Sequence, residues 1–103
     1  MSLNHTVRQD GATTIVLLNG SFTFSDNAAF RQVIEPIVAA KPRTVMVDLS
    51  GLSSIDSAGL SMLVLLRDRM TKVGGTVTLK HPPKDVARIL EVVDFGKLFT
   101  IVA

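Results

Sequence analysis

Two aspartates and four serines gather between Asp48 and Ser57, where one apolar segment ends and another begins. Asp56 and Ser57 are both favoured helix N-cap residues, and a helix N-terminus has unpaired N–H groups and a partial positive charge. A phosphoryl group on Ser57 would lie at a favourable helix end while adding about two negative charges beside Asp56. Gly59 would let another backbone approach the first turn closely. From their types and spacing alone, helix capping is the favoured interpretation of these residues, and a phosphoryl group on Ser57 is a second interpretation that can coexist with it.

The remaining reactive side chains are too scattered to predict a catalytic or metal site. A nucleophilic Ser57 would need a base, and neither His5 nor His81 is spaced to meet it or to gather metal ligands. The chain has no cysteine, and Gly96-Lys97 lacks the glycine-rich run of a phosphate-binding loop. We therefore expect no catalytic activity, no metal and no cofactor.

Length, charge and hydropathy predict the number of domains, the kind of partner and the location of the protein. The chain has 103 residues, which predicts a single domain over residues 1–103. Its net charge is +2 with scattered basic residues, and it has five phenylalanines but no tryptophan or tyrosine, so we expect no nucleic-acid partner. The N-terminus lacks a signal-peptide pattern, and the longest nearly apolar run, 60–66, is too short to cross a bilayer. These features predict a cytoplasmic protein without membrane insertion.

The pattern of apolar residues predicts an α/β fold with the order ββαβαβαβ. Asp10-Gly11 between two extended segments predicts an antiparallel hairpin at the start. Single helices between the later strands imply right-handed crossovers, hence a mixed sheet with helices packed mainly on one side. The predicted strands are 5–9, 13–18, 44–49, 76–80 and 99–102, and the predicted helices are 25 or 26 to 40, 56 or 57 to 72, and 83–93.

Three segments depart from the regular pattern of helices and strands: the first helix, residues 50–55 and the second helix. Pro36 lies inside the first helix and should kink or split it near Glu35, because proline removes a backbone hydrogen bond. Residues 50–55 are polar enough to predict a loop. The second helix is apolar nearly all round and should be mostly buried, with some of Met62, Leu65 and Leu66 exposed.

The string DLSGLSSIDSAGLSMLV, residues 48–64, resembles the signature of STAS domains. In that signature a strand ending in Asp-Leu-Ser leads through a short segment to Asp-Ser-x-Gly-Leu at a helix start. In the anti-sigma-factor antagonists of this family, the serine after the second aspartate is phosphorylated by an ATP-using anti-sigma kinase, and the matching residue is Ser57. The resemblance spans nearly the whole chain and implies a STAS-like sheet.

The chain departs from this family pattern at two places. Ala58 replaces a second hydroxyl residue often found in the phosphorylated antagonists, and alanine there also resembles the STAS subunits of lipid transporters. The loop after the second strand reads Gly20-Ser21-Phe22-Thr23-Phe24, whereas relatives usually have glycine, an acidic residue, an aliphatic residue and aspartate. That loop normally contacts the kinase. If it is extended here, Phe22 and Phe24 lie on either side of Thr23 and point the same way. We also expect one of the two rings to belong to the core and the other to contact a partner.

The resemblance implies a regulatory module that binds an anti-sigma factor or serine kinase of the ATPase type until Ser57 is phosphorylated. Two alternatives remain: a constitutive STAS subunit of a membrane lipid-transport ATPase complex, and a small-ligand sensing STAS module that uses Phe22 and Phe24. A homodimer through an exposed second helix is a further possibility. The expected partner-binding residues are Phe22, Thr23, Phe24, Asp56, Ser57, Ala58, Gly59, Ser61, Met62 and Leu65.

Overall fold

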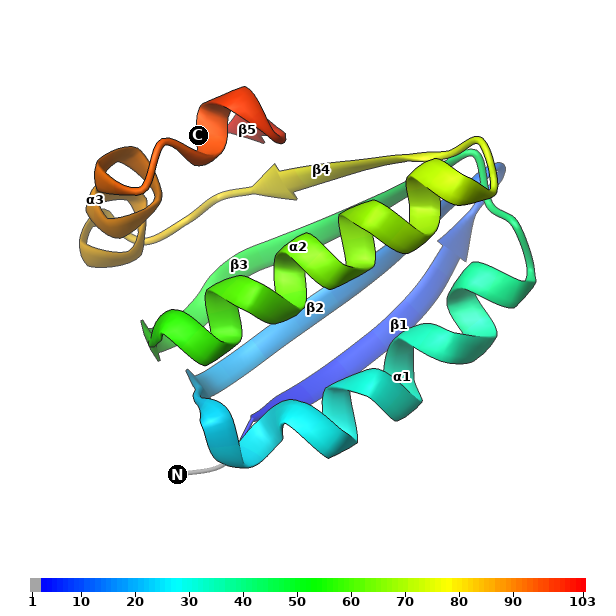
Figure 1. Ribbon diagram of the computed structural model, residues 1–103. Helices are drawn as coiled ribbons and strands as arrows, with labels where there is room; N and C mark the ends of the chain where they lie inside the picture. The colour runs from blue at the N-terminus through cyan, green and yellow to red at the C-terminus, as the bar shows by residue number, and fades with distance from the viewer. Residues whose placement is uncertain (1–2) are drawn as a thin grey trace.

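A five-stranded mixed sheet organises the chain in the computed structural model, which describes residues 3–103 (Figure 1). The strands lie in the order in which they follow one another in the sequence, with β1 antiparallel to β2 and the others parallel. This confirms the predicted order ββαβαβαβ. The strands are β1 (Asn4–Asp10), β2 (Thr13–Phe22), β3 (Thr44–Ile55), β4 (Thr76–Lys80) and β5 (Thr100–Val102), and the helices are α1 (Asn27–Ala39), α2 (Ser57–Lys72) and α3 (Lys84–Val92).

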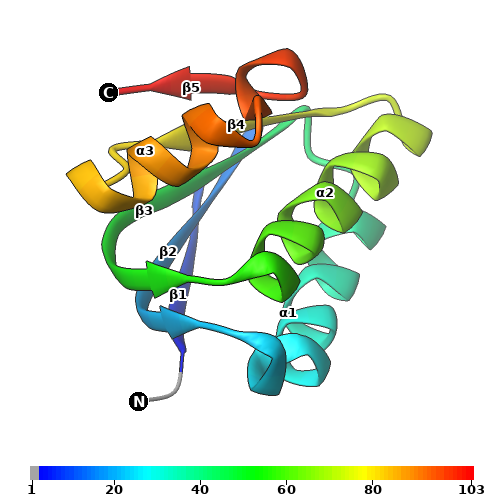
Figure 2. The ribbon, with the colours of Figure 1, turned by 60° about the vertical axis from the view of Figure 1, so that its left-hand side comes forward.

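The core lies between one face of the sheet and the helices α1 and α2, which run side by side over it (Figures 1 and 2). Alternate residues of the central strands, such as Val16, Val47 and Leu79, point into this core and are buried. Their neighbours Ile15 and Met46 point to the opposite face and are only partly buried. None of the helices within residues 3–103 is long and apolar enough to span a membrane.

The strands β2 and β3 are longer than the sequence predicted, and the loop expected at 50–55 is wrong. Pairing continues to Phe22 opposite Ile55, through register shifts on either side of Asn19 and Gly20. These irregularities break the two-residue alternation that identifies a strand in sequence, and the serines of this stretch lie on its exposed side. Gly51 allows the two strands to stay close, because a Cβ there would lie 2.9 Å from the Leu18 carbonyl oxygen.

Helix α1 is continuous from Asn27 to Ala39, so of the two predicted effects of Pro36, a kink or a split, the split is wrong. Pro36 lies on the exposed side of the helix, where water can solvate the carbonyl group that proline leaves without a partner. A 3₁₀ turn, η1 (Phe24–Asp26), precedes the helix. Phe30 and Ile34 form the buried stripe that the spacing predicted.

The ends of α2 agree with the prediction to the residue. Asp56 caps its N-terminus, and Gly74 follows its C-terminus with a positive φ of 81°. The expectation that this helix is mostly buried is confirmed, because α1, β3 and β4 all contact it. Of the three residues considered for exposure, Met62 and Leu66 belong to the core and Leu65 is half-buried.

Candidate functional site

Asp56 joins the end of β3, the start of η1 and the first turn of α2. Its Oδ1 accepts a hydrogen bond from the Gly59 N–H at 2.9 Å, and its Oδ2 accepts one from the Phe24 N–H at 3.2 Å. Its own N–H donates to the Phe22 carbonyl oxygen at 3.1 Å. The carboxylate satisfies one of the unpaired N–H groups of the helix, as the capping prediction required. Asp56 thus fixes where the α2 N-terminus lies relative to Phe24.

Gly59 brings α2 into direct contact with the end of β2. A Cβ at this position would lie 2.6 Å from the Phe22 carbonyl oxygen and 2.8 Å from Cγ1 of Ile55. Both separations are shorter than any ordinary carbon contact. The close backbone approach expected from the sequence is therefore present, and the glycine is needed to reach it.

Asp26 holds the segment before α1 in place. It is buried, and it accepts hydrogen bonds from the N–H groups of Thr23 at 2.9 Å and Leu3 at 3.2 Å. The Thr23 N–H, assisted by that of Leu3, lowers the pKa of the Asp26 carboxyl against the opposing effect of burial. Asp26 lies directly before α1 but makes no side-chain cap bond to it, and its bond with Leu3 comes from a distant part of the chain. This anchoring leaves Phe24 pointing outwards.

The residues expected to bind a partner divide by burial into a surface set and a core set. Phe24 has 73% of its surface exposed, whereas Phe22 has 0% and Met62 has 5%. Phe22 packs against Phe30, with ring centroids 4.8 Å apart. Exposed members of the expected set are Phe24, Asp56, Ser57 and Ser61; half-buried members are Thr23, Ala58 and Leu65; buried members are Phe22, Gly59 and Met62.

Two expectations need correction as a result. Phe22, Gly59 and Met62 are buried beneath the surface residues of the site, so they are not available for direct contact with a partner. The idea of a ligand site built on Phe22 and Phe24 is also wrong, because one ring is in the core and the other is in solvent. The two rings do not point the same way, because a 3₁₀ turn begins at Phe24. Phe22 is in the core as one part of the expectation required, and contact of Phe24 with a partner stays a prediction.

An apolar groove of about 290 Å³ opens beside Ser57. The segment after α3 forms its far wall, and it is held to α2 by a hydrogen bond from Arg67 Nε to the Leu98 carbonyl oxygen at 2.8 Å. The sequence analysis did not predict this wall, which depends on the tertiary contact between α2 and the segment after α3. The groove is lined by Ser57, Leu60, Ser61, Val64, Val93 and Phe95.

Asp48, the first aspartate of the family-like segment, lies within β3 opposite Lys80, away from the Asp56 end of the strand. Burial raises the pKa of its carboxyl, but the hydrogen bond from the Ser50 N–H at 2.9 Å and the nearby charges of His81 and Lys80 outweigh that effect, so the pKa is lowered overall. The carboxylate is therefore ionised at neutral pH. Throughout residues 3–103, no group of three or more histidine, aspartate or glutamate side chains is placed to hold a metal ion.

Comparison with known protein families gives a match over nearly the whole chain. The family model described as "Mlab, STAS domain" matches residues 5–102. A STAS-domain containing protein of Pseudomonas aeruginosa (strain UCBPP-PA14) is 35% identical over 92 residues, which cover 89% of this chain and 90% of that protein.

Solved structures with the same fold include anti-sigma factor antagonists. A protein of Thermotoga maritima described as such an antagonist superposes with a TM-score of 0.88 at 20% identity, covering 96% of this chain and 86% of that one. The anti-sigma factor antagonist SpoIIAA in its unphosphorylated form gives 0.77 at 18% identity, covering 97% and 88%. The phosphorylated form of the Bacillus cell fate determinant SpoIIAA gives 0.74 at 16% identity, covering 97% and 92%. At these identities the likeness establishes the fold alone.

Proposed function

The chain belongs to the STAS domain family, and from this membership we propose that it is a regulatory binding module, similar to the anti-sigma-factor antagonists, with Ser57 as its phosphorylation switch. Unphosphorylated, it binds an anti-sigma factor or another serine kinase of the ATPase type. Phosphorylation of Ser57 ends that contact. The observation that carries the proposal is that Ser57 is exposed at the first residue of α2, where it lines an apolar groove.

The proposed contact surface combines features that protein interfaces favour. Phe24 is an exposed aromatic side chain of the type that anchors interfaces. The groove between α2 and Val93 is apolar and large enough for a partner side chain. Ser57 lines this groove, so a partner group that enters it must pass close to the Ser57 hydroxyl group. Phe24 is tied to the residue before Ser57, because its N–H donates to the Asp56 carboxylate at 3.2 Å.

A phosphoryl group on Ser57 would alter this surface without requiring a change in the fold. It adds about two negative charges next to Asp56 and at the mouth of the apolar groove. The α2 N-terminus stabilises such a charge by about 0.3–1 kcal/mol, so the helix itself tolerates it. An apolar partner group entering the groove would meet an unpaired, hydrated anion, and this opposes binding.

The first test is mass spectrometry of the protein isolated from its native cells under phosphatase inhibition. We expect one phosphoryl group, localised by peptide sequencing to Ser57. A chain carrying Ser57→Ala should lose it, and one carrying Ser53→Ala, a nearby exposed serine outside the groove, should keep it. Absence of the modification across growth and stress conditions would contradict the switch.

The second test measures affinity for the purified ATPase-type partner. We expect Ser57→Asp to weaken binding at least tenfold, equivalent to about 1.4 kcal/mol, while Ser53→Asp and Ser57→Ala leave it nearly unchanged. Undiminished binding by Ser57→Asp would count against the proposal, because the introduced carboxylate lies at the same point of the groove.

Ala58 favours a second candidate function. Alanine at this position resembles the STAS subunits of lipid transporters, and the matching family model carries the description "Mlab, STAS domain". Under this alternative the chain is a constitutive subunit of a membrane lipid-transport ATPase, and the surface around Ser57 binds an ATPase subunit permanently. A stable stoichiometric complex that survives both Ser57→Ala and Ser57→Asp would favour this candidate over the switch.

A further inference from the structure

Strand β1 forms a long open edge of the sheet. Its seven residues are all exposed, and within residues 3–103 no strand pairs with its outer side. The opposite edge is β5, which has only three residues. Proteins commonly protect their sheet edges with short strands, prolines, bulges or charged side chains; β1 has only the last of these, Arg8 and Asp10.

The unpaired backbone groups of this edge belong to alternate residues of β1. Gly11 and Ala12 form the two-residue turn that closes the hairpin on the pair Asp10 and Thr13, and such a turn is closed by a hydrogen-bonded pair. Hydrogen-bonded and non-bonded pairs alternate along an antiparallel ladder. His5, Val7 and Gln9 therefore turn their N–H and C=O groups towards the open edge.

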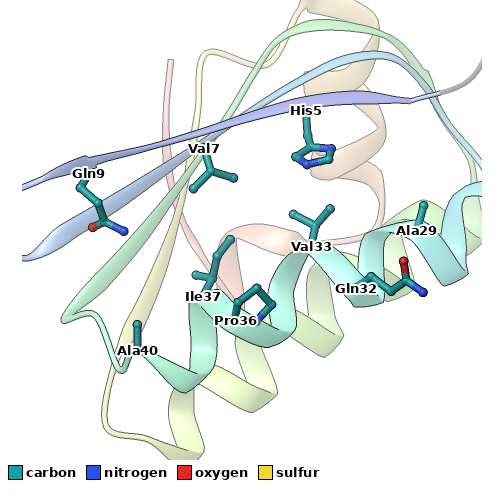
Figure 3. A pocket seen from close by; sticks show the side chains of 9 residues that line it. All are labelled: His5, Val7, Gln9, Ala29, Gln32, Val33, Pro36, Ile37 and Ala40. Atoms are coloured by element: carbon teal, nitrogen blue, oxygen red, sulfur yellow. The ribbon is translucent and has the colours of Figure 1, made fainter.

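The side chains of the same three residues face helix α1 across a groove of about 590 Å³ (Figure 3). Val33 and Ile37 project into this groove from the helix, opposite Val7. Val7 remains 40% exposed, so α1 covers it incompletely. The groove is thus apolar at its centre, with a histidine and a glutamine towards its ends, and it shares no residue with the Ser57 surface.

We propose that this edge binds a second copy of the chain, joining two β1 strands antiparallel about a twofold axis at Val7. This register uses every outward backbone group, because His5 of each copy pairs with Gln9 of the other while the two Val7 residues pair together. The axis falls at the middle residue of the strand, so the whole of β1 is paired. The dimer is independent of the proposed switch at Ser57.

The side chains of β1 are also compatible with this self-pairing. On the helix side, Val7 meets Val7 and the polar His5 meets the polar Gln9. On the other side, Arg8 lies opposite Thr6 and Asp10 lies opposite Asn4. No like charges stand directly opposite one another, an arrangement that would disfavour the pairing. The pattern of the strand is therefore self-complementary in this register and favours a second copy over an unrelated peptide.

Disulfide trapping tests both the dimer and its register, since the chain has no cysteine of its own. In a hydrogen-bonded antiparallel pair the two Val7 Cα atoms would be about 5.5 Å apart, within the range that a disulfide bridges. The matched control is Thr6→Cys. In the proposed register residue 6 of one chain lies opposite residue 8 of the other, so the Cα atoms of the two cysteines would be about 8 Å apart, beyond that range. Under mild oxidation we expect Val7→Cys to form covalent dimer at least tenfold faster than Thr6→Cys.

Sedimentation equilibrium of the unmodified chain supplies the second measurement. We expect a concentration-dependent dimer whose dissociation constant rises at least tenfold in Val7→Lys, because two like charges then meet at the axis. Val92→Lys, the same change at a valine that is 79% exposed on α3, should leave the dissociation constant unchanged. A chain that stays monomeric at every concentration, equal trapping rates for the two cysteine variants, or faster trapping of Thr6→Cys would each overturn the proposal.

Discussion

Replacing Gly59 by alanine tests whether α2 is seated directly on the end of β2. The added methyl group would lie 2.6 Å from the Phe22 carbonyl oxygen and 2.8 Å from Cγ1 of Ile55. The first of these neighbours is backbone and cannot rotate away, so the first turn of α2 must move outwards. That movement also stretches the 2.9 Å hydrogen bond between the Gly59 N–H and Asp56.

The expected loss of stability follows from these contacts. Overpacking of this kind costs about 1–3 kcal/mol, and weakening the N-cap adds up to about 1 kcal/mol. The higher helix propensity of alanine returns at most about 1 kcal/mol. We therefore expect a net loss of about 1–3 kcal/mol. For a domain of this size, each kcal/mol lowers Tm by about 4–8 °C.

Thermal and urea unfolding, followed by circular dichroism, measure this difference. The matched control is Gly96→Ala, because a Cβ at Gly96 meets no atom within 4 Å and its φ is not positive. The control should be as stable as the unmodified protein or gain up to about 1 kcal/mol. If Gly59→Ala unfolds at the same urea concentration as Gly96→Ala, the close seating of α2 on β2 is refuted.

Two further substitutions test the carboxylates that hold the site together. Asp56→Ala removes the acceptor shared by the Gly59 and Phe24 N–H groups and should cost about 1–2 kcal/mol in urea unfolding; Asp68→Ala, at an exposed helix position, should change stability by less than about 0.5 kcal/mol. Because the folded-state pKa of Asp26 is lowered, its stabilisation is present above the unfolded-state pKa, near pH 4, and is lost as pH falls through the folded-state value. Asp26→Asn should flatten this acid-side decline in the urea midpoint, and an unchanged pH dependence would contradict the role of the Thr23 and Leu3 bonds.

Local chemistry explains which parts of the fold the sequence could predict. The ends of α2 were predicted correctly because Asp56 and Gly74 act on their immediate neighbours, through a cap and a positive φ. The length of β3 was not predicted correctly, because the second half of this strand is defined by its pairing with β2, which is distant in sequence. Register shifts beside Asn19 remove the alternation on which strand prediction depends.

The candidate site was predictable to a similar extent. The types and spacing of Asp56, Ser57 and Gly59 indicated the helix start and the close approach, and both are present in the structure. Met62 was placed on the surface because a helix that is apolar all round gives no clue to its orientation. The wall at Val93 depends on how the segment after α3 returns to α2, and only the tertiary structure establishes that contact.

The arrangement around Ser57 separates the groups that hold the fold from the group proposed to carry the switch. Both oxygens of Asp56 are engaged by backbone N–H groups, and Gly59 is buried against β2, whereas Ser57 between them is exposed. Charge added at Ser57 therefore changes the surface while these structural contacts stay in place. Under the proposed function, Ser57→Asp should weaken partner binding yet keep the stability of the unmodified chain, whereas Asp56→Ala should lose stability whether or not a partner is present. Loss of both stability and binding in Ser57→Asp would mean that Ser57 also supports the fold, and the proposed separation would then be wrong.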